Sequence, residues 1–398
     1  MIPVRLLKSG DPVDWAYLLE ITGADSGSLG RLRMRDRITS ILIGDMPSPA
    51  ASILKQCMLS GGADALVHRE VLTCRVECSK AVVYGTPASI LRGCDSLRNQ
   101  PFSLGELGSE IRKLIEEACL PGFLEFGGTR LSYGRHPLIM GILNITPDSF
   151  SDGGSCTSSE EAASKAVEME REGASIIDVG GESTRPGSLP VSAREQIRRV
   201  IPVIRLIRST SSVPISVDTC LPEVAYAAVD AGASMINSVD GMETPGMVKA
   251  ASELDVPVCV MHMRGTPETM QMNPEYGDAS QEIGDYLLKA VERLTGSGVK
   301  KERILVDPGI GFGKRLEDNL ELIGSLEWLK IHTGCRVLLG HSRKSFLGLI
   351  SGIENPGERD CLSHIVSVLQ RGADLLRVHD VSGTRSSLRL AELMGALR

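Results

Sequence analysis

The sequence has few of the features that mark membrane, secreted or nucleic-acid-binding proteins. No apolar run approaches the roughly 18 residues that a transmembrane helix needs. The N-terminus, MIPVRLLKSGDPVDW, lacks the apolar core of a signal peptide. Blocks of Lys and Arg are also missing and the formal net charge is −7, which argues against a nucleic-acid or membrane-surface partner. We therefore expect a cytoplasmic protein whose ligands are small molecules.

The cysteines form no metal-binding or disulfide pattern. The chain has 10 cysteines, and the closest pair, Cys74 and Cys78, is separated by three residues instead of the two that are usual in a zinc site. A second pair of Cys or His residues that would complete a zinc set is missing. We interpret the cysteines as small apolar core residues in a reducing compartment.

What the sequence does contain is a series of eight short apolar runs, each ending in a polar residue. The runs are Leu138–Leu143, Ser175–Val179, Pro214–Val217, Ser234–Ile236, Val256–Met261, Arg303–Val306, Arg336–Leu339 and Asp374–Val378. The polar residues at or just beyond their ends are Asn144, Asp178, Asp218, Asn237, His262, Asp307, Ser342 and His379. Eight buried strands that alternate with helical patterns are typical of a (β/α)₈ TIM barrel. Because the interior of such a barrel is packed, we expect the chemistry at the carboxyl ends of the strands.

Length and pattern predict a second, smaller domain before the barrel. A chain of 398 residues is longer than one barrel of about 270 residues and too short for two. We assign residues 121–398 to the barrel, with a hairpin at Phe123–Tyr133 that closes its bottom. Residues 1–120 are predicted to form a small α/β domain, to which we assign no function. Its expected strands are Pro3–Leu7, one or two within Arg31–Ile43, Ala65–Cys74 and Ala81–Gly85, and its expected helices are Asp11–Ile21, one from Ser48 to Gly61-Gly62, Pro87–Arg98 and Ser103–Glu117.

Three polar residues at strand ends predict a binding pocket for a nitrogen-rich ring. Asp218, Asn237 and Asp307 end the third, fourth and sixth strands. Carboxylates and amides are costly in the mouth of a barrel unless they are paired. A 2-amino-4-oxo-pyrimidine would satisfy them together, with Asp307 accepting two hydrogen bonds from its guanidine-like edge. The alternative is an internal polar network, or an ion pair with an Arg or Lys of the barrel.

The loops after the first two strands contain candidate ligands for a metal and an anion. Asn144 precedes a loop rich in hydroxyls, Asp and Gly, and its amide oxygen is a suitable ligand for Mg²⁺. In DVGGESTRPG, Arg185 is a fixed cation suited to phosphate or carboxylate, and Thr184 adds a hydroxyl. For both loops the alternative is a solvated turn.

The last two strands end in further donors. Ser342, Arg343 and Lys344 follow the seventh strand, where barrels often bind anions, and we expect Lys344 to reach a ring carbonyl or nitrogen. Arg377 and His379 alternate along the eighth strand and therefore point to one side. Together with Arg185 and Asn144 they are candidates for holding a diphosphate.

His262 and the methionines near it are less informative. His262 ends the fifth strand, where it either orients its neighbours or is a buried histidine with satisfied hydrogen bonds. We expect the four methionines around it to line the pocket or belong to the core: Met261, Met263, Met270 and Met272.

These segments, in this order, resemble the dihydropteroate synthases. The matching stretches are ILNITPDSFSDGG, DVGGESTRPG, SVDT, MIN, VMHMRGTPETMQ, LVDPGIGFGK, GHSRKSFLG and LRVHDV. The resemblance covers Phe123 to Arg398 and leaves the first 120 residues outside. It implies a (β/α)₈ barrel that condenses 6-hydroxymethyl-7,8-dihydropterin diphosphate with 4-aminobenzoate, releases diphosphate and is a target of sulfonamides. We also expect a homodimer. One departure is the Ser238 that follows Asn237, where the family often has Asp.

The resemblance implies roles for individual residues, grouped here by subsite. The pterin residues are Asp218, Asn237, Asp307, Lys344 and Arg377. The diphosphate residues are Asn144, Arg185, Arg377 and His379, with Asn144 as the Mg²⁺ residue. The 4-aminobenzoate residues are Thr184, Arg185, Pro186, Phe312 and Ser342. Catalytic roles fall to Asn144, Arg185, Lys344, Arg377 and His379.

The implied mechanism is dissociative substitution at the pterin methylene, in which a neutral amine attacks and no strong base is needed. Three alternatives remain at this point. A pterin-dependent methyltransferase has a similar barrel and pocket but no diphosphate to hold. The residues that argue against it are Arg185, Ser342–Lys344, Arg377 and His379. A non-catalytic binding protein is disfavoured because all expected site residues are present. A synthase that uses a modified arylamine is not distinguished by the sequence.

Overall fold

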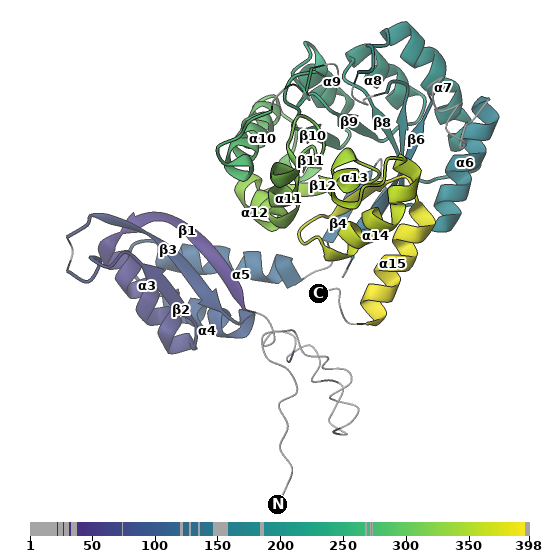
Figure 1. Cartoon of the computed structure of the whole chain (residues 1–398). Coiled ribbons are helices and arrows are strands. Elements are labelled where there is room, and N and C mark those ends of the chain that lie inside the picture. The colour runs from purple at the N-terminus through teal and green to yellow at the C-terminus, as the bar shows by residue number, and fades with distance from the viewer. Residues whose placement is uncertain are drawn as a thin grey trace, which may run out of the picture. The chain divides into compact units, whose positions relative to one another are not determined.

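The structure, a computed structural model, divides the chain into two compact units, Met1–Pro121 (with Arg398) and Gly122–Leu397. It describes residues 38–394 except 74, 120–121, 127–128, 134–135, 146–157, 184–186, 267–268, 271 and 273, together with Thr22, Gly27 and Leu32. The strand expected at Pro3–Leu7 and the helix expected at Asp11–Ile21 lie outside these residues. Figure 1 shows the first unit in purple to blue and the second in teal to yellow.

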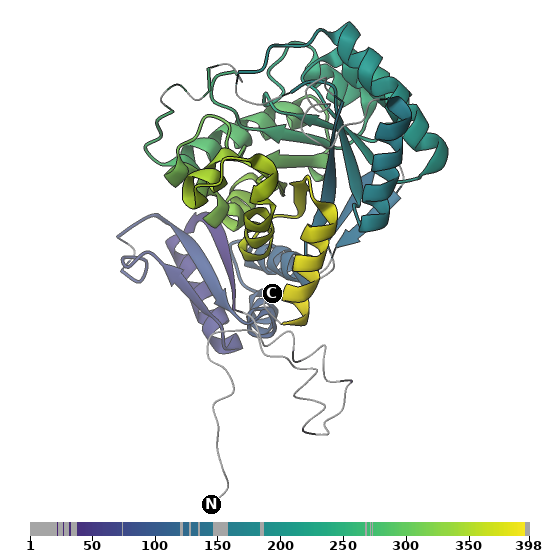
Figure 2. The same ribbon diagram turned by 45° about the vertical axis from the view of Figure 1, so that its right-hand side comes forward.

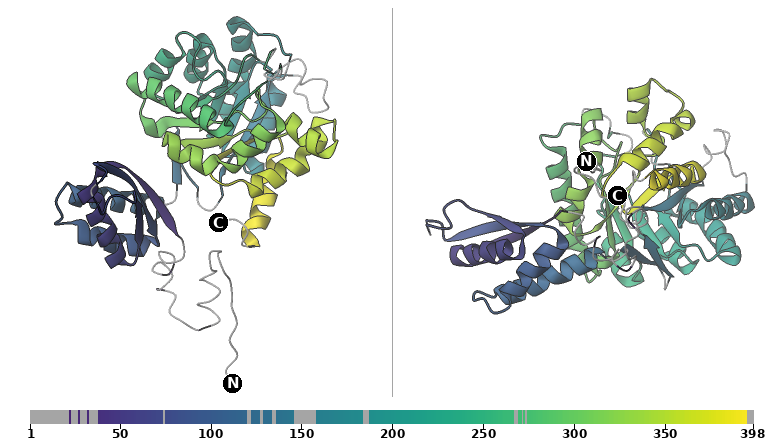
Figure 3. Two further views of the ribbon diagram at one scale, coloured as in Figure 1. Left: turned by 60° about the vertical axis from the view of Figure 1, so that its left-hand side comes forward. Right: turned by 90° about the horizontal axis from the view of Figure 1, so that it is seen from below.

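The first unit is a three-stranded antiparallel sheet covered on one side by helices. The strand order is β1-β3-β2, with β1 (Thr39–Pro47), β3 (Cys78–Gly85) and β2 (Asp64–Val67). Helices α3 (Ser48–Gly61) and α4 (Pro87–Leu97) pack on the sheet, and α5 (Leu104–Cys119) packs on α4 (Figure 3). A core of buried side chains that includes Leu54, Met58, Val83 and Ile90 lies between the layers. This core is separate from those of the second unit.

One strand of the first unit is shorter than predicted. Ala65–Cys74 was expected to be a single strand, but β2 ends at Val67 and turns follow. The backbone N–H of Val71 donates to the carbonyl of His68, and the Thr73 hydroxyl donates to the carbonyl of Glu70. Local turn bonds therefore satisfy the backbone groups that a longer strand would have paired with a neighbour. The predicted helix from Ser48 to Gly61 is present.

The second unit is a closed barrel of eight parallel strands, which confirms the predicted fold class. In barrel order the strands are β6 (Leu138–Asn144), β7 (Ile176–Gly180), β8 (Ile215–Asp218), β9 (Met235–Ser238), β10 (Val258–Met261), β11 (Ile304–Asp307), β12 (Arg336–Leu339) and β13 (Leu375–Val378). All eight are almost entirely buried, as expected for parallel strands covered on both faces. No helix among the described residues is long and apolar enough to cross a membrane.

The helices surround the strands (Figures 1 and 2). They are α6 (Ser159–Glu172), α7 (Ala193–Thr210), α8 (Pro222–Asp230), α9 (Met247–Leu254), α10 (Ala279–Gly296), α11 (Leu316–Gly324), α12 (Leu326–Thr333), α13 (Ser345–Ser351), α14 (Asp360–Leu369) and α15 (Val381–Leu393). Two short 3₁₀ helices, Lys301–Arg303 and Pro356–Arg359, precede β11 and α14. Capping explains several of the helix starts: for example, the Ser192 and Asp278 side chains accept hydrogen bonds from the first turns of α7 and α10.

A hairpin closes the amino end of the barrel. It consists of β4 (Gly122–Phe126) and β5 (Thr129–Tyr133), which pair in antiparallel register. Leu124 and Phe126 are buried against residues near the starts of the barrel strands, among them Met140 and Leu305. Because this end is filled with apolar side chains, a ligand has room only at the carboxyl ends of the strands.

Candidate active site

Five barrel strands bring polar side chains together at the carboxyl end. They are Asp178 on β7, Asp218 on β8, Asn237 on β9, Asp307 on β11 and Arg377 on β13. The parallel register pairs Gly180 with Asp218 and Asp218 with Asn237, so the ends of these strands are level. All four acidic and amide side chains belong to residues that are at most 9% exposed. The three residues predicted to hold a nitrogen-rich ring therefore end neighbouring or facing strands of one barrel mouth.

Arg377 is held inside this group by two carboxylates. Its Nε donates to Asp178 Oδ2 at 2.6 Å, and one terminal nitrogen donates to Asp218 Oδ2 at 2.8 Å. The Asn237 amide also donates to Asp178 Oδ2, at 3.1 Å. The internal ion pair considered from the sequence is thus present for Asp218, and Asp178 pairs with the same Arg377. Burial alone would lower the pKa of Arg377, but these carboxylates more than offset it and the pKa is raised.

Burial shifts the pKa values of several ionisable groups of the site towards 7. It raises the pKa of Asp218 to about 7, with Arg377 opposing the shift. It also raises the pKa of Asp307 to about 6, although the backbone N–H of Gly309 donates to this carboxylate at 2.7 Å and opposes the rise. The pKa of Lys344 falls to about 7, again through burial, with the nearby Arg377 adding to the shift. Changes in pH near 7 therefore alter the charge of the pocket.

The loop after β12 contributes two of the three expected donors. Lys344 lies over the Phe312 ring, with Nζ 3.8 Å from the ring centroid. The Ser342 hydroxyl is 3.0 Å from His379 Nδ1 and accepts a hydrogen bond from the backbone N–H of His379. Arg343, the third donor of this turn, instead bonds Asp360 at the start of α14 at 2.7 and 2.8 Å. Its backbone has a left-handed conformation (φ 59°).

Sequence reasoning missed Lys314, a buried cation beside the pocket. Its Nζ lies 3.0 Å from His262 Nδ1 and 3.0 Å from the carbonyl oxygen of Phe312. Burial lowers the pKa of Lys314 to about 7, while the Asp307 carboxylate opposes the shift. Burial and the Lys314 charge together lower the pKa of His262 to about 3, so this imidazole is neutral and accepts at Nδ1. The available signal was a single Lys in the Gly-rich segment that follows Asp307.

This segment lies tightly against the end of β10. Gly309 has φ 69°, and a Cβ atom there would lie within 2 Å of the His262 carbonyl oxygen. Phe312 is buried with Met261 and Met270, as expected for lining or core residues. Met272 was expected to join them, but it is 76% exposed.

Hydrogen bonds to Glu182 and Gln196, which the sequence analysis did not single out, hold the loop after β7 near both of its ends. Glu182 accepts hydrogen bonds from the Val191 backbone at 3.1 Å and from the Gln196 amide at 2.6 Å. Gln196 in turn accepts from the Thr219 hydroxyl, next to Asp218, at 3.0 Å. Burial raises the pKa of Glu182. The residues of this loop predicted to bind ligands lie outside the described residues: Thr184, Arg185 and Pro186.

Asn144 ends β6 beside a glycine that leaves space for a ligand. A Cβ atom on Gly180 would lie 3.5 Å from Asn144 Oδ1 and 3.5 Å from Asp218 Cβ, so any larger residue would fill this cradle. Among the described residues there is no cluster of three His, Cys, Asp or Glu side chains that would hold a metal on its own. A single amide oxygen fits Mg²⁺ that is bound mainly through substrate phosphates and water.

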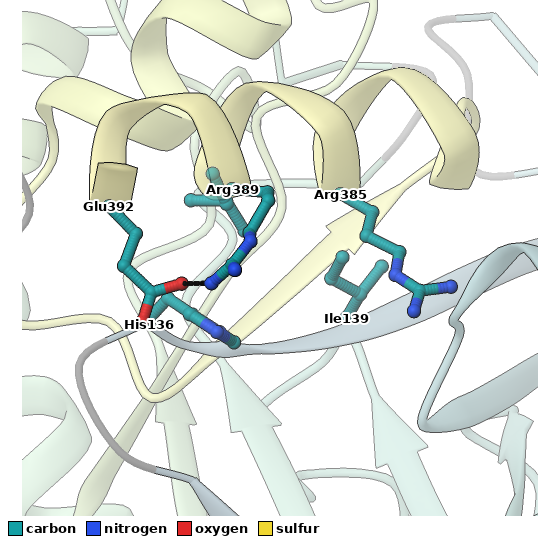
Figure 4. Close-up of a pocket in the computed structure, with 6 residues that line it drawn as sticks. His136, Ile139, Arg385, Arg389 and Glu392 are labelled. Carbon is teal, nitrogen blue, oxygen red and sulfur yellow. Dashed lines mark hydrogen bonds and ion pairs between the residues drawn. The ribbon is translucent and has the colours of Figure 1, made fainter. Parts of the chain in front are cut away.

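A cavity elsewhere on the barrel does not belong to this site. It has a volume of about 370 Å³ and is lined by residues from α15 and from the start of β6 (Figure 4). Arg389 and Glu392 form an ion pair at its rim. Because the cavity involves the amino end of β6, it is separated from the polar groups at the carboxyl ends of the strands.

Comparisons with known proteins agree on one group of relatives. The family described as pterin binding enzyme matches residues 140–379. The dihydropteroate synthase of Escherichia coli K12 is 45% identical over 267 residues, which cover 67% of this chain and 94% of that protein. A Yersinia pestis dihydropteroate synthase with a sulfonamide drug is 38% identical, with a TM-score of 0.65 and coverages of 69% and 100%. The Xanthomonas albilineans dihydropteroate synthase with 4-aminobenzoic acid is 42% identical, with a TM-score of 0.64 and coverages of 70% and 100%.

The buried position of Lys314 generates a stability prediction. Replacing Lys314 with Met should lower the free energy of unfolding of the barrel by about 2–4 kcal/mol, because two buried acceptors lose their donor. Denaturant unfolding of the whole chain, followed through the barrel transition, measures this change. Lys249→Met is the matched control, since Lys249 is exposed and its ion pair with Glu253 contributes less than about 1 kcal/mol. An unchanged or higher free energy of unfolding for Lys314→Met would contradict this prediction. It would show that the desolvation of the ammonium group offsets the stabilisation from its hydrogen bonds.

Proposed function

The chain belongs to the dihydropteroate synthase family of pterin-binding enzymes, and from this premise we propose how its barrel carries out the family's reaction. The reaction condenses 6-hydroxymethyl-7,8-dihydropterin diphosphate with 4-aminobenzoate and releases diphosphate. The observation that carries the assignment to this pocket is the set of buried acidic and amide groups at the ends of β8, β9 and β11. Buried groups of this kind suit a ring with several N–H donors.

The pterin ring is proposed to bind across these strand ends. Asp307 accepts from the 2-amino group and the neighbouring ring N–H, while Asp218 and Asn237 serve the other ring nitrogens. Lys344 donates to a ring carbonyl or nitrogen. The Phe312 ring beneath its ammonium group keeps Lys344 in place, and Arg377 completes the cationic side of the pocket. Together these contacts hold the methylene carbon of the pterin at the open end of the barrel.

The diphosphate is proposed to lie above the ring, next to Asn144 and His379. Arg185 and Arg377 complete this subsite, although Nε and one terminal nitrogen of Arg377 are already engaged by Asp178 and Asp218. We therefore assign Arg377 mainly to the pterin side. Asn144 would hold Mg²⁺ jointly with the diphosphate oxygens. When bound, the ion neutralises the charge that develops on the leaving diphosphate.

The 4-aminobenzoate is proposed to bind between the loops after β7, β11 and β12. Phe312 supplies an apolar wall and Ser342 a hydroxyl donor, and the loop residues Thr184, Arg185 and Pro186 complete the site. The hydrogen bond between Ser342 and His379 links this subsite to the diphosphate residues. The arylamine nitrogen can then approach the methylene carbon from the side opposite the diphosphate.

The bond changes follow from this arrangement. The bond between the methylene carbon and the diphosphate oxygen breaks first, and its electron pair leaves with the diphosphate. The electron-rich dihydropterin stabilises the cationic methylene, which the neutral amine attacks to form the new carbon–nitrogen bond. The amine then loses one proton. A neutral arylamine needs no strong base for the attack, so the work of the protein is to orient the substrates and neutralise charge.

The experiment that tests this function measures diphosphate release with a panel of arylamines. Release with the pterin diphosphate and 4-aminobenzoate, which requires Mg²⁺ and stops when chelator is added, is the expected result. Turnover only with a ribosylated or phosphorylated aminobenzene would identify a modified acceptor instead. No release with any arylamine would contradict a synthase.

Replacing Asp307 or Asn237 with Ala should weaken pterin diphosphate binding far more than folding. Each change removes hydrogen bonds to a ring in a dry pocket, which costs roughly 1–3 kcal/mol. Isothermal titration calorimetry measures the affinity, and thermal unfolding of the same samples controls for damage to the fold. If either variant binds the pterin diphosphate as tightly as the wild-type chain, the pocket is assigned to the wrong residues.

We further propose that the protein is a cytoplasmic homodimer without a nucleic-acid partner. The cysteines that the structure describes are free thiols, consistent with a reducing compartment. Helices α14 and α15 pack together, and each exposes large apolar residues, including Ile365 and Leu369 on α14 and Leu390 and Leu393 on α15. Paired apolar helices of this kind favour association.

Light scattering should therefore give twice the mass of one chain. The substitution Leu369→Glu should shift the mass towards that of a monomer, because a charge would be buried without a partner. Leu189→Glu is the control, since Leu189 is similarly exposed but lies outside both helices. A wild-type chain that is monomeric at high concentration would exclude the dimer.

A further inference from the structure

Asp178 is a buried carboxylate to which the reaction described above gives no role. It ends an apolar run in the sequence, yet none of the three subsites includes it. In the structure it lies in the middle of β7, is 0% exposed, and is level with Ser216 on β8. Isolated carboxylates are rarely this deeply buried, because an unpaired charge is costly in the interior. Its position therefore calls for an explanation beyond packing.

One oxygen of Asp178 connects two residues of the proposed pterin subsite. Asp178 Oδ2 accepts from Arg377 Nε at 2.6 Å and from Asn237 Nδ2 at 3.1 Å. Arg377 comes from β13 and Asn237 from β9, and each of these strands is separated from β7 by one other strand of the barrel. The Asp178 carboxylate thus links side chains from β13 and β9, the outer two of five adjacent strands. It determines the orientation of both side chains.

The bond to Asn237 has a directional consequence. Because the amide nitrogen donates to Asp178, the Asn237 Oδ1 atom is the end left for a ligand, where it acts as an acceptor. The bonds to Arg377 likewise hold one edge of the guanidinium towards Asp178 and Asp218. Without the Asp178 carboxylate, Arg377 is held by Asp218 alone, and the Asn237 amide can present its nitrogen to the ring instead of its oxygen.

Asp178 also balances the charge of the buried group. Asp178, Asp218 and Asp307 face three cations: Arg377, Lys344 and Lys314. Removing the charge of Asp178 leaves an excess of positive charge in a region of low dielectric. We expect the pKa values of the remaining carboxylates to fall, and we expect these carboxylates to attract Arg377 away from its present position.

We propose that Asp178 is a positioning residue for the pterin subsite, which orients the Arg377 guanidinium and the Asn237 amide without touching the ring itself. This inference rests on the proposed binding of the pterin in this pocket. The competing explanation is that Asp178 and Arg377 form a core ion pair that serves only the stability of the barrel.

The test compares Asp178→Asn with Ser216→Ala in the full chain. Asn has nearly the same shape as Asp but carries no charge. Ser216 is equally buried and level with Asp178, and its hydroxyl has no hydrogen-bond partner among the described residues. We expect Asp178→Asn to bind 6-hydroxymethyl-7,8-dihydropterin diphosphate about 10- to 100-fold more weakly, the range seen when partners that orient metal ligands are removed. Ser216→Ala should bind within about twofold of the wild-type chain.

The pH dependence of the pterin affinity separates positioning from packing. Asp218 is surrounded by ionisable groups on several elements: Arg377, Asp178, Lys344, Glu182 and Cys220. Burial raises the pKa of Asp218 to about 7, Arg377 lowers it, and the negative charge of Asp178 raises it further. The wild-type affinity should therefore fall as the pH decreases through about 7. In Asp178→Asn the pKa of Asp218 is lower, so the fall should occur at a lower pH, and the affinity at high pH should also be reduced.

A double-mutant cycle tests whether Asp178 acts through Arg377. Arg377→Gln and the double variant Asp178→Asn/Arg377→Gln should differ by less than about threefold in pterin affinity, since the remaining path through Asn237 is a single neutral hydrogen bond. This comparison also serves if Asp178→Asn alone does not fold, because the double variant removes both members of the ion pair. A double variant that binds more than about tenfold more weakly than Arg377→Gln would overturn the proposal.

The outcomes distinguish this inference from the proposed function. A wild-type chain that does not bind the pterin diphosphate overturns both. A wild-type chain that binds it, with Asp178→Asn equally tight, overturns only the role of Asp178. A variant with lower affinity but an unchanged pH midpoint also overturns it, because a loss of packing alone does not alter the ionisation of Asp218.

Discussion

The barrel depends on the mutual neutralisation of charged groups that it buries at one end. Three carboxylates and three cations from β7, β8, β11, β13 and the adjoining loops lie within this group. Each would be strongly destabilising alone, because a low dielectric disfavours isolated charge. Arg377 compensates two of the buried carboxylate charges, because it forms ion pairs with Asp178 and Asp218 at the same time. The same arrangement leaves a pocket whose hydrogen-bonding groups are already oriented before a ligand arrives.

The two ends of the barrel interior have opposite characters, and this contrast locates the function. The amino end is filled by apolar residues of the strands and by Leu124 and Phe126 of the hairpin. The carboxyl end carries the acidic, amide and basic groups. A parallel barrel allows this division because every strand crosses from one end to the other in the same direction. The first unit has a core of its own.

Hydrogen bonds from single polar side chains hold two of the loops that adjoin the mouth. Lys314 ties the segment after β11 to His262, and Glu182 ties the start of the loop after β7 to Gln196. Gln196 also accepts a hydrogen bond from Thr219, beside Asp218. The start of the loop after β7 is therefore joined to the end of β8 through hydrogen bonds within the described residues. A change at either anchor is expected to reach the substrate through the loop it holds.

The sequence by itself determined the barrel and the strand ends that carry its polar groups. Eight apolar runs with polar ends leave little choice of fold, because parallel strands buried on both faces need this pattern. The hydrogen-bond partners of the side chains and the directions in which they point were decided only by the tertiary structure. Arg343 bonds Asp360 on α14, and the segment expected as one strand over Ala65–Cys74 forms a short strand followed by turns. Lys314 and Asp178 have roles because they contact residues that are distant in the sequence, His262 and Arg377 respectively. Spacing along the sequence does not indicate such contacts.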